Sequence, residues 1–243
     1  MFGKPTPRID GIAKVTGAAR FASDEPVARP AYGYLVTSSI ARGKIRSFGL
    51  EQARAVRGVL DILTYENVGS LTKPAQGPDG KATTTSLENA QIWHAGQIVA
   101  IVVADTYESA REAAHKVIVN YSELSPSATF DAAGVETEPH ETEEGSDPKV
   151  GSANRAFDSA PAKFEGHYAT PTQHHNPIEL FTTTCVWNGP KLTIYEPSQF
   201  MWGTKASVAQ RLGIEPDKVR AVSRYVGGRM VVDILAIINS GLF

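Results

Sequence analysis

Three short runs of apolar and β-branched residues in the first half of the chain have the pattern of buried or half-buried β-strands. Glycine or polar residues bound each run, as is usual where strands end. The runs extend over Tyr32 to Ser38, Val59 to Thr64 and Ile98 to Ala104. Between the first two, Leu50, Ala53 and Val56 recur at helical spacing, and Gly58 follows them as a stop signal. The first part of the chain is therefore predicted to mix helices and strands.

The clearest local unit follows Gly96, where a strand, a helix and a second strand are predicted in succession. The run from Ile98 leads into Asp105, and Glu108 stands three residues later in the spacing of a capping box. A stripe of small apolar residues then recurs at helical spacing, at Ala110, Ala113, Ala114 and Val117. Such a stripe packs closely against a sheet. The chain returns as a strand from Val117 to Tyr121.

A stretch with linker composition separates this part from a second one. From Ser127 to Ala162 aromatic and branched residues become sparse, and acidic residues gather between Glu136 and Asp147. This composition favours a solvated loop between two domains. An acidic interaction tail is the alternative interpretation.

The second part begins near Phe164 and predicts a β-hairpin. Residues from Phe181 to Trp187 alternate in the manner of a strand, and a second strand follows from Lys191 to Glu196. The Asn188-Gly189 pair between them is a strong turn signal.

A helix and a last strand are predicted after the hairpin. Thr204 is expected to cap the helix, and Gly213 is expected to end it. The strand from Val219 to Tyr225 then leads to Gly227 and Gly228. A glycine pair allows backbone N–H groups to approach a ligand closely, because no Cβ blocks the way. The same pair also suits an ordinary turn, and the residues alone leave both interpretations open.

Composition and charge narrow the function classes. A chain of 243 residues suffices for one large or two small domains. The formal net charge of -2 does not suggest a continuous basic surface, so nucleic acid is not an expected partner. A single cysteine, Cys185, excludes an intrachain disulfide and an iron–sulfur cluster held by four thiolates of this chain. Its apolar surroundings in the sequence favour packing over a nucleophilic role.

The two ends of the chain bear on its location. Residues Met1 to Gly11 lack the apolar segment of a secretory signal, so a cytoplasmic protein is expected. Export to the periplasm together with a partner is the alternative. The apolar run from Met230 to Ile238 is shorter than the roughly 20 residues that span a bilayer. No membrane partner is therefore expected.

Polar side chains gather from Gln173 to Glu179, directly before a predicted strand. A ligand at the edge of a sheet would meet such side chains there. His174 and His175 are adjacent, so in an extended chain they point to opposite sides and do not reach one metal together. Thiolates at zinc-site spacing are also missing, and no metal site is predicted. Apart from contact with such a ligand, each histidine is suited to capping a loop or to hydrogen-bonding backbone groups.

Several stretches of the chain together carry a family likeness. They are Gly3 to Asp24, Gly96 to Asp105 with the alanine-rich helix and Val119 to Tyr121, His175 to Glu179, Leu192 to Glu196, Gln199, and Val226 to Gly228. In this order they resemble the large, molybdenum-binding subunit of the xanthine dehydrogenase and aldehyde oxidase family. The resemblance implies an α+β fold in which an α/β hammerhead domain is followed by a truncated α+β molybdopterin-binding domain.

The resemblance also implies a cofactor, partners and site residues. Large subunits of this family hold molybdenum on molybdopterin and hydroxylate aldehydes or N-heterocycles through a Mo-hydroxide, and electrons pass to iron–sulfur (Fe-S) and FAD subunits. By likeness, Gln173 hydrogen-bonds an oxygen ligand of the metal, and the backbone of Gly227 and Gly228 lies against the cofactor. Glu179 matches a family acid with a role in structure or pocket shape. No residue of this chain is assigned as a catalytic residue or as a metal ligand.

The likeness runs from about Gly3 to Gly228 and ends there. Arg229 and Met230 stand where the family has a third glycine and a phenylalanine, and we hypothesise that a shift of reading frame produced the remaining residues. The expected divisions are a hammerhead domain at 1–126, a linker at 127–162, a partial molybdopterin-binding domain at 163–228 and a non-family tail at 229–243. The family's general-base glutamate lies beyond the matched region.

These features lead to two functional hypotheses. The first is an N-terminal fragment of a molybdenum hydroxylase large subunit that takes a small-molecule substrate and is inactive alone. The second is a non-catalytic interaction module that docks a partner subunit through its hammerhead domain. Molybdenum or pterin in the purified protein would favour the first hypothesis, whereas a partner complex without cofactor would favour the second.

Overall fold

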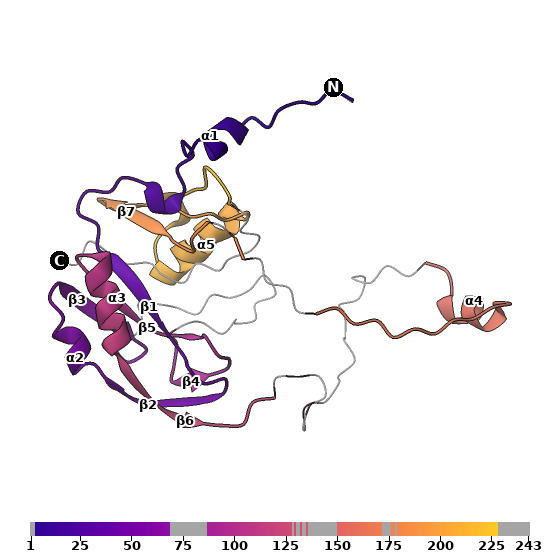
Figure 1. Ribbon diagram of the computed structural model, residues 1–243, viewed down its shortest axis with the longest axis horizontal. Coiled ribbons are helices and arrows are strands. Elements are labelled where there is room, and N and C mark those ends of the chain that lie inside the picture. Colours follow the sequence, from indigo (N-terminus) through magenta and orange to yellow (C-terminus); the bar gives the residue numbers. More distant parts are fainter. Residues whose placement is uncertain are drawn as a thin grey trace. The chain divides into compact units, whose positions relative to one another are not determined.

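A computed structural model describes residues 3–68, 87–127, 129, 132, 135, 150–171, 176–177 and 179–227 (Figure 1). Its helices and strands form the α+β fold that the sequence predicts. The described residues of 1–126 and 175–243 group into one compact unit, and those of 127–174 into a second. The tail at 229–243 and the acidic run at 136–147 lie outside the described residues.

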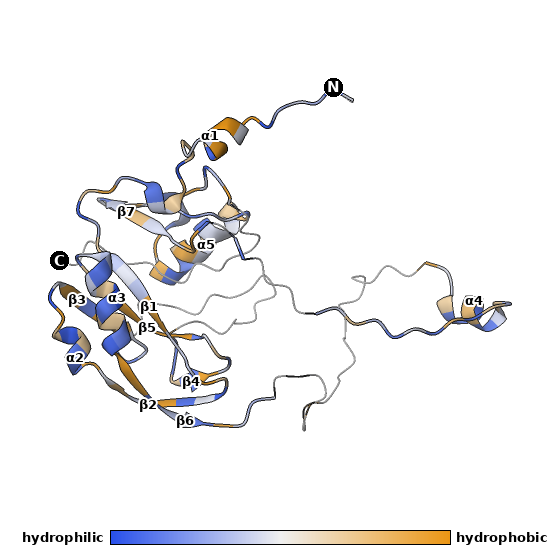
Figure 2. Ribbon diagram, viewed as in Figure 1, coloured by the Kyte–Doolittle hydropathy of each residue, from blue (hydrophilic) through white to orange (hydrophobic). Residues whose placement is uncertain are grey.

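The first sheet contains the three strands that the apolar runs predict. They are β1 (Tyr32–Thr37), β5 (Ile98–Ala104) and β3 (Val59–Thr64), in the order β1-β5-β3. Both outer strands are antiparallel to β5. Every residue of β5 is buried, because apolar clusters lie against both faces of this central strand. Figure 2 shows the corresponding concentration of hydrophobic residues in this part of the molecule.

Two helices cover one face of this sheet. The first, α2 (Glu51–Arg54), is shorter than its spacing predicts, and α3 (Tyr107–Lys116) is the predicted long helix. The alanine stripe is buried against the sheet at Ala110, Ala113 and Ala114. The predicted capping box of Asp105 and Glu108 is wrong. The hydroxyl of Thr106 accepts the backbone N–H of Ser109 at 3.1 Å and caps the helix instead.

A second small sheet is built from strands that alternate along the chain with those of the first sheet, and the sequence predicts only one of them. It consists of β4 (Gln91–Ile92), β2 (Gly43–Gly49) and β6 (Ile118–Glu123), in the order β4-β2-β6. The sequence predicts β6 but not β2 or β4. Buried Ile45 and Ile92 pack with Val99 of β5, which joins the two sheets through one apolar cluster.

The C-terminal sheet confirms the predicted hairpin. Strands β7 (Thr184–Asn188) and β8 (Lys191–Tyr195) are antiparallel, and Gly189 of the turn has a φ of 57°. The last strand, β9 (Val219–Val222), is shorter than the predicted Val219 to Tyr225 and runs parallel to β8.

A helix connects the two parallel strands, as a parallel pair requires. This helix, α5 (Met201–Leu212), ends at Gly213 with a φ of 65°, as predicted. It packs on the sheet through the apolar cluster of Leu192, Ile194, Val208, Ala209 and Val219. Thr204 is not its cap, because the helix begins three residues earlier and Thr204 is buried inside it. A short 3-10 turn, Pro216–Lys218, precedes β9.

Within the described residues, three further helical segments lie outside the sheets. The N-terminal segment contains α1 (Gly11–Val15) and a 3-10 turn at Ala22–Asp24. The stretch expected to be a linker contains α4 (Ala153–Ser159), which the sequence pattern does not predict. Among the described residues, no helix is long and apolar enough to cross a membrane.

Candidate functional site

The carboxyl ends of β8 and β9 meet at one edge of the C-terminal sheet, because these strands are parallel. Ligands of open sheets with parallel strands commonly bind beyond this edge. The chain leaving β8 passes through Glu196 and Gln199 into α5, and the chain leaving β9 passes through Tyr225 to Gly227. The fold thus brings two loops to one edge. Both contain residues that carry the family likeness.

Ser198 fixes the path of the first loop into α5. Its hydroxyl accepts the backbone N–H of Phe200 at 3.1 Å and the hydroxyl of Thr204 at 3.3 Å. Ser198 is therefore the side chain that satisfies a donor at the start of this helix, a role that the sequence pattern assigned to Thr204. Between Ser198 and the helix, Gln199 is exposed at the sheet edge.

Gly227 is held by a buried carboxylate from a distant part of the sequence. Its backbone N–H donates to Oε2 of Glu179 at 2.6 Å, and the two residues are 48 positions apart. Glu179 is only 7% exposed, and its other oxygen, Oε1, is buried without a hydrogen-bond partner among the described residues. Burial of an acid in this way needs a good donor, which the backbone N–H supplies.

Glu179 also explains why residue 227 is a glycine. A Cβ at this position would lie 2.5 Å from Cβ of Glu179 and 3.3 Å from Cε1 of Phe21. The first distance is too short for two carbon atoms, so only glycine permits this packing. The space that a Cβ of residue 227 would occupy is therefore filled by protein side chains.

The N-terminal segment forms the other side of this loop. The ring of Phe21 meets the ring of Tyr225 edge to face, with centroids 6.0 Å apart, and the hydroxyl of Thr184 donates to the carbonyl of Ala22 at 2.7 Å. Lys14 donates to the carbonyl of Val226 at 3.5 Å. These contacts join residues more than 160 positions apart, and no local pattern could have predicted them.

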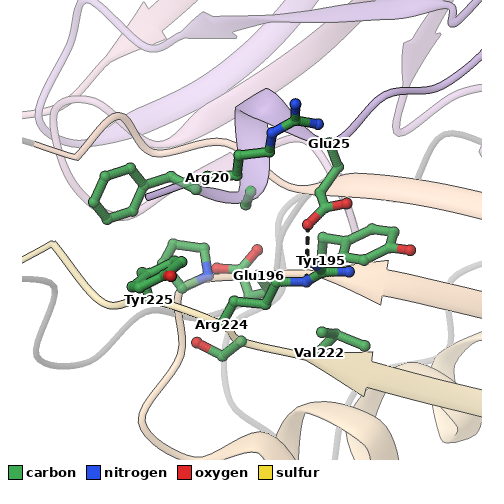
Figure 3. A pocket seen from close by; sticks show the side chains of 11 residues that line it. Arg20, Glu25, Tyr195, Glu196, Val222, Arg224 and Tyr225 are labelled. Carbon is green, nitrogen blue, oxygen red and sulfur yellow. Dashed lines mark ion pairs between the residues drawn. The ribbon is translucent and has the colours of Figure 1, made fainter. Parts of the chain in front are cut away.

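Figure 3 shows a small cavity between the N-terminal segment and the sheet edge. Glu25 forms an ion pair with Arg224 across it at 3.2 Å, and Tyr195, Glu196 and Tyr225 lie around it. The cavity has a volume of about 10 Å³, the size of a single water molecule. It is too small for an organic substrate or cofactor. Its walls hold the N-terminal segment against the loop that follows β9.

The environment of Cys185 agrees with a packing role. Its side chain lies against the apolar cluster under α5. Burial, and secondarily the nearby carboxylate of Glu196, raise the pKa of this thiol to about 12. Glu196 itself is buried and accepts a hydrogen bond from the hydroxyl of Thr183. A thiol with so high a pKa is not a nucleophile at neutral pH.

The structure locates only part of the predicted cofactor-binding set. Gly227 lies at the sheet edge described above, whereas Gln173 and Gly228 lie outside the described residues, as do His174 and His175. Those assignments stay predictions. In the part of the chain that the structure describes, no three histidine, cysteine, aspartate or glutamate side chains are grouped to hold a metal.

Comparison with protein families matches nearly the whole chain in two consecutive parts. Residues 16–125 match the a/b hammerhead domain of aldehyde oxidase and xanthine dehydrogenase. Residues 135–229 match the molybdopterin cofactor-binding domain. The sheet edge with Gly227 and Glu179 belongs to the second match.

Similar curated proteins include two from Escherichia coli O157:H7. The molybdenum-binding subunit PaoC of an aldehyde oxidoreductase is 36% identical over 93% of this chain and 30% of its own length. A xanthine dehydrogenase molybdenum-binding subunit is 33% identical over 91% of this chain and 31% of its own length. The chain therefore spans about a third of the length of these relatives.

Solved structures share the fold. The aldehyde oxidoreductase from Desulfovibrio desulfuricans superposes with a TM-score of 0.72 and 25% identity, over 94% of this chain and 27% of that one. Quinoline 2-oxidoreductase from Pseudomonas putida superposes with a TM-score of 0.75 and 22% identity, over 93% of this chain and 30% of that one. At the latter identity the likeness is evidence for the fold alone.

Proposed function

Because the chain belongs to the xanthine dehydrogenase and aldehyde oxidase family of molybdenum hydroxylases, we propose that it contributes the hammerhead domain and the first part of the cofactor-binding domain to an enzyme that hydroxylates aldehydes or N-heterocycles. The cofactor of this family is molybdenum on molybdopterin, which supplies the redox and oxygen-transfer chemistry when bound. This chain contributes positioning groups and backbone to that enzyme.

The observation that carries this proposal is the edge at the carboxyl ends of β8 and β9. Its second loop is oriented by a buried acid at Gly227, inside the region that matches the cofactor-binding domain. The edge beyond the carboxyl ends of parallel strands is where open sheets commonly hold their ligands. The orphaned Oε1 of Glu179 also leaves an acceptor near this turn for which the described residues offer no donor.

Two glutamines compete for the role of hydrogen-bonding an oxygen ligand of the metal. The family likeness assigned it to Gln173, which lies outside the described residues. Gln199 is exposed at the edge that β8 and β9 share, so its place in the fold suits the same role. We expect Gln199→Ala to lower molybdenum retained per chain more than Gln173→Ala. Elemental analysis of purified protein measures this, and the reverse order would return the role to Gln173.

The activity of the isolated chain is a separate part of the proposal. Since the chain spans about 30% of its bacterial relatives, we propose that the remaining walls of the active centre come from polypeptide outside this sequence. The isolated chain should then show no hydroxylation of benzaldehyde or of a purine with an artificial electron acceptor. Reproducible turnover by protein free of other subunits would contradict this.

Partners follow from the same reasoning. Relatives are named molybdenum-binding subunits, and we propose that electrons from this enzyme leave through iron–sulfur and FAD subunits. Affinity purification of the tagged chain from its native host should recover such subunits together with molybdenum. Recovery of partners without molybdenum or pterin would support the alternative function, in which the hammerhead domain is a docking module without a catalytic role.

A further inference from the structure

A single peptide unit at the sheet edge is bound at both of its ends by oppositely charged side chains. The carbonyl of Val226 accepts from Nζ of Lys14 at 3.5 Å, and the N–H of Gly227 donates to Oε2 of Glu179 at 2.6 Å. These two groups belong to the same peptide bond. We propose that Lys14 and Glu179 are positioning residues that select one orientation of this peptide, and with it the backbone that faces the cofactor. The link to the cofactor rests on the proposed function above.

The cationic side of this arrangement is itself held in place. Lys14 pairs with Asp10 four residues earlier at 3.0 Å, and its side chain is 22% exposed. Its Nζ also lies 6.0 Å from the centre of the Tyr225 ring, within the range of a cation–π contact. Hydrogen bonds from Arg8 and Lys14 lower the pKa of Asp10 to about 2. Asp10 therefore stays ionised at neutral pH and keeps the ammonium group oriented.

The anionic side is held by packing. Glu179 is buried, and its Cβ occupies the space that a side chain at residue 227 would fill. The carboxylate therefore has little freedom to turn away from the N–H of Gly227. It approaches from a segment 48 residues earlier, whereas Lys14 approaches from one 212 residues earlier.

The two charges act on the peptide dipole in the same direction. A peptide unit has a dipole of about 3.5 D, and here the cation lies at its negative end and the anion at its positive end. Rotating this peptide by half a turn would place its carbonyl oxygen against the carboxylate and its N–H against the ammonium group. Glycine permits φ of either sign, so the backbone at Gly227 does not itself forbid that rotation. Lys14 and Glu179 therefore stabilise one of the two peptide orientations that glycine permits.

The first experiment measures hydrogen exchange at the Gly227 amide, and its result does not depend on a bound cofactor. Amide hydrogen exchange at Gly227 is followed by NMR in the 243-residue chain and in the Lys14→Met and Glu179→Gln variants. We expect exchange at this amide to rise at least tenfold in both variants, and Lys14→Arg to restore slow exchange. Matched controls are Lys116→Met and Glu112→Gln, which remove an exposed ion pair of α3. They should change exchange at Gly227 less than twofold.

The second experiment measures molybdenum and pterin retained per chain in the same variants. We expect both to fall severalfold in Lys14→Met and Glu179→Gln and to remain unchanged in the α3 controls. Unaltered exchange at Gly227 in Lys14→Met, with circular dichroism unchanged, would overturn the positioning role whatever the function. Faster exchange with undiminished molybdenum would overturn its connection to the cofactor. Molybdenum absent from the parent chain even when it is purified together with the polypeptide that supplies the remaining walls would contradict the proposed function instead, leaving the exchange result to decide the positioning role.

Discussion

At the scale of single residues, the contact between Gly227 and Glu179 shows what a sequence motif does and does not reveal. The glycine pair drew attention to the segment after the last strand, and its first member, Gly227, has its N–H bound by Glu179. Its partner was missed, because Glu179 is 48 positions away and nothing in the spacing connects the two. Glycine is needed at this position because of the contact with Glu179, which forms only in the folded chain.

Replacing Gly227 by alanine should destabilise the protein by roughly 1–3 kcal/mol, because the new Cβ overpacks against Glu179. Urea denaturation measures the change in the free energy of unfolding. Gly11→Ala is the matched control, since a Cβ there meets only an ordinary contact at 3.6 Å. An alanine at 227 that cost no more than the control would show that the loop relaxes freely.

Cys185 predicts a loss of stability at alkaline pH. Burial raises the pKa of its thiol to about 12, above the value of roughly 8.5 in an unfolded chain. The stabilising effect of the neutral thiol is complete below about pH 8.5 and is lost as the pH rises towards 12, because only the unfolded chain then ionises. The urea midpoint should therefore fall more steeply between about pH 8 and pH 10.5 in the parent protein than in Cys185→Ala. Parallel curves would contradict this.

At the scale of helices and strands, elements with a strong local pattern were predicted and elements fixed by their neighbours were not. The sequence predicts β5 and α3 correctly because their buried positions follow the regular apolar spacing of a buried strand and of a helix. In contrast, β2 is bounded by glycines, and its apolar residues Ile45 and Phe48 are three positions apart, because the register with β6 shifts between Ile45 and Ser47. Without a period of two, the sequence of β2 does not predict a strand. The cap of α3 was misplaced by one residue because both Asp105 and Thr106 suit the role.

Thr106→Ala tests the observed cap. Losing the bond to the N–H of Ser109 should cost about 1 kcal/mol of folding stability. Glu108→Ala, which removes the acid of the predicted capping box, should cost only a few tenths of a kcal/mol through the helix dipole. Thermal melting of the two variants compares them directly. A larger loss in Glu108→Ala would restore the capping box.

At the scale of the whole molecule, the N-terminal segment belongs structurally with the C-terminal sheet. Ala22 accepts from Thr184, and Glu25 pairs with Arg224, although the elements from β1 to β6 lie between them in the sequence. The composition of residues 127–162 suggested a simple succession of domains. The order of elements along the chain could not have shown that Phe21 to Glu25 contact β7 and the loop that follows β9.

Limited proteolysis tests this arrangement. Described residues between 150 and 171 are almost all exposed, so trypsin should cut at Arg155 or Lys163 before it cuts the sheets. The two fragments should nevertheless coelute in gel filtration, because Phe21 and Glu25 hold the C-terminal fragment. The double variant Phe21→Ala, Glu25→Gln should release it. Separation of the parent fragments after the first cut would contradict this.

The contact between Lys14 and Val226 also determines when the N-terminal segment can fold during synthesis. Lys14 and Val226 are 212 residues apart, and a ribosome that adds about 5–20 residues per second needs roughly 10–40 s between them. The strands from β1 to β6 can pair during that interval, since all their partners have emerged. Lys14 and Phe21 must wait beside them without their contacts to Val226 and Tyr225. During translation, the segment around Lys14 thus leaves the ribosome well before the residues that fix it, and throughout that wait it is open to chaperones and proteases.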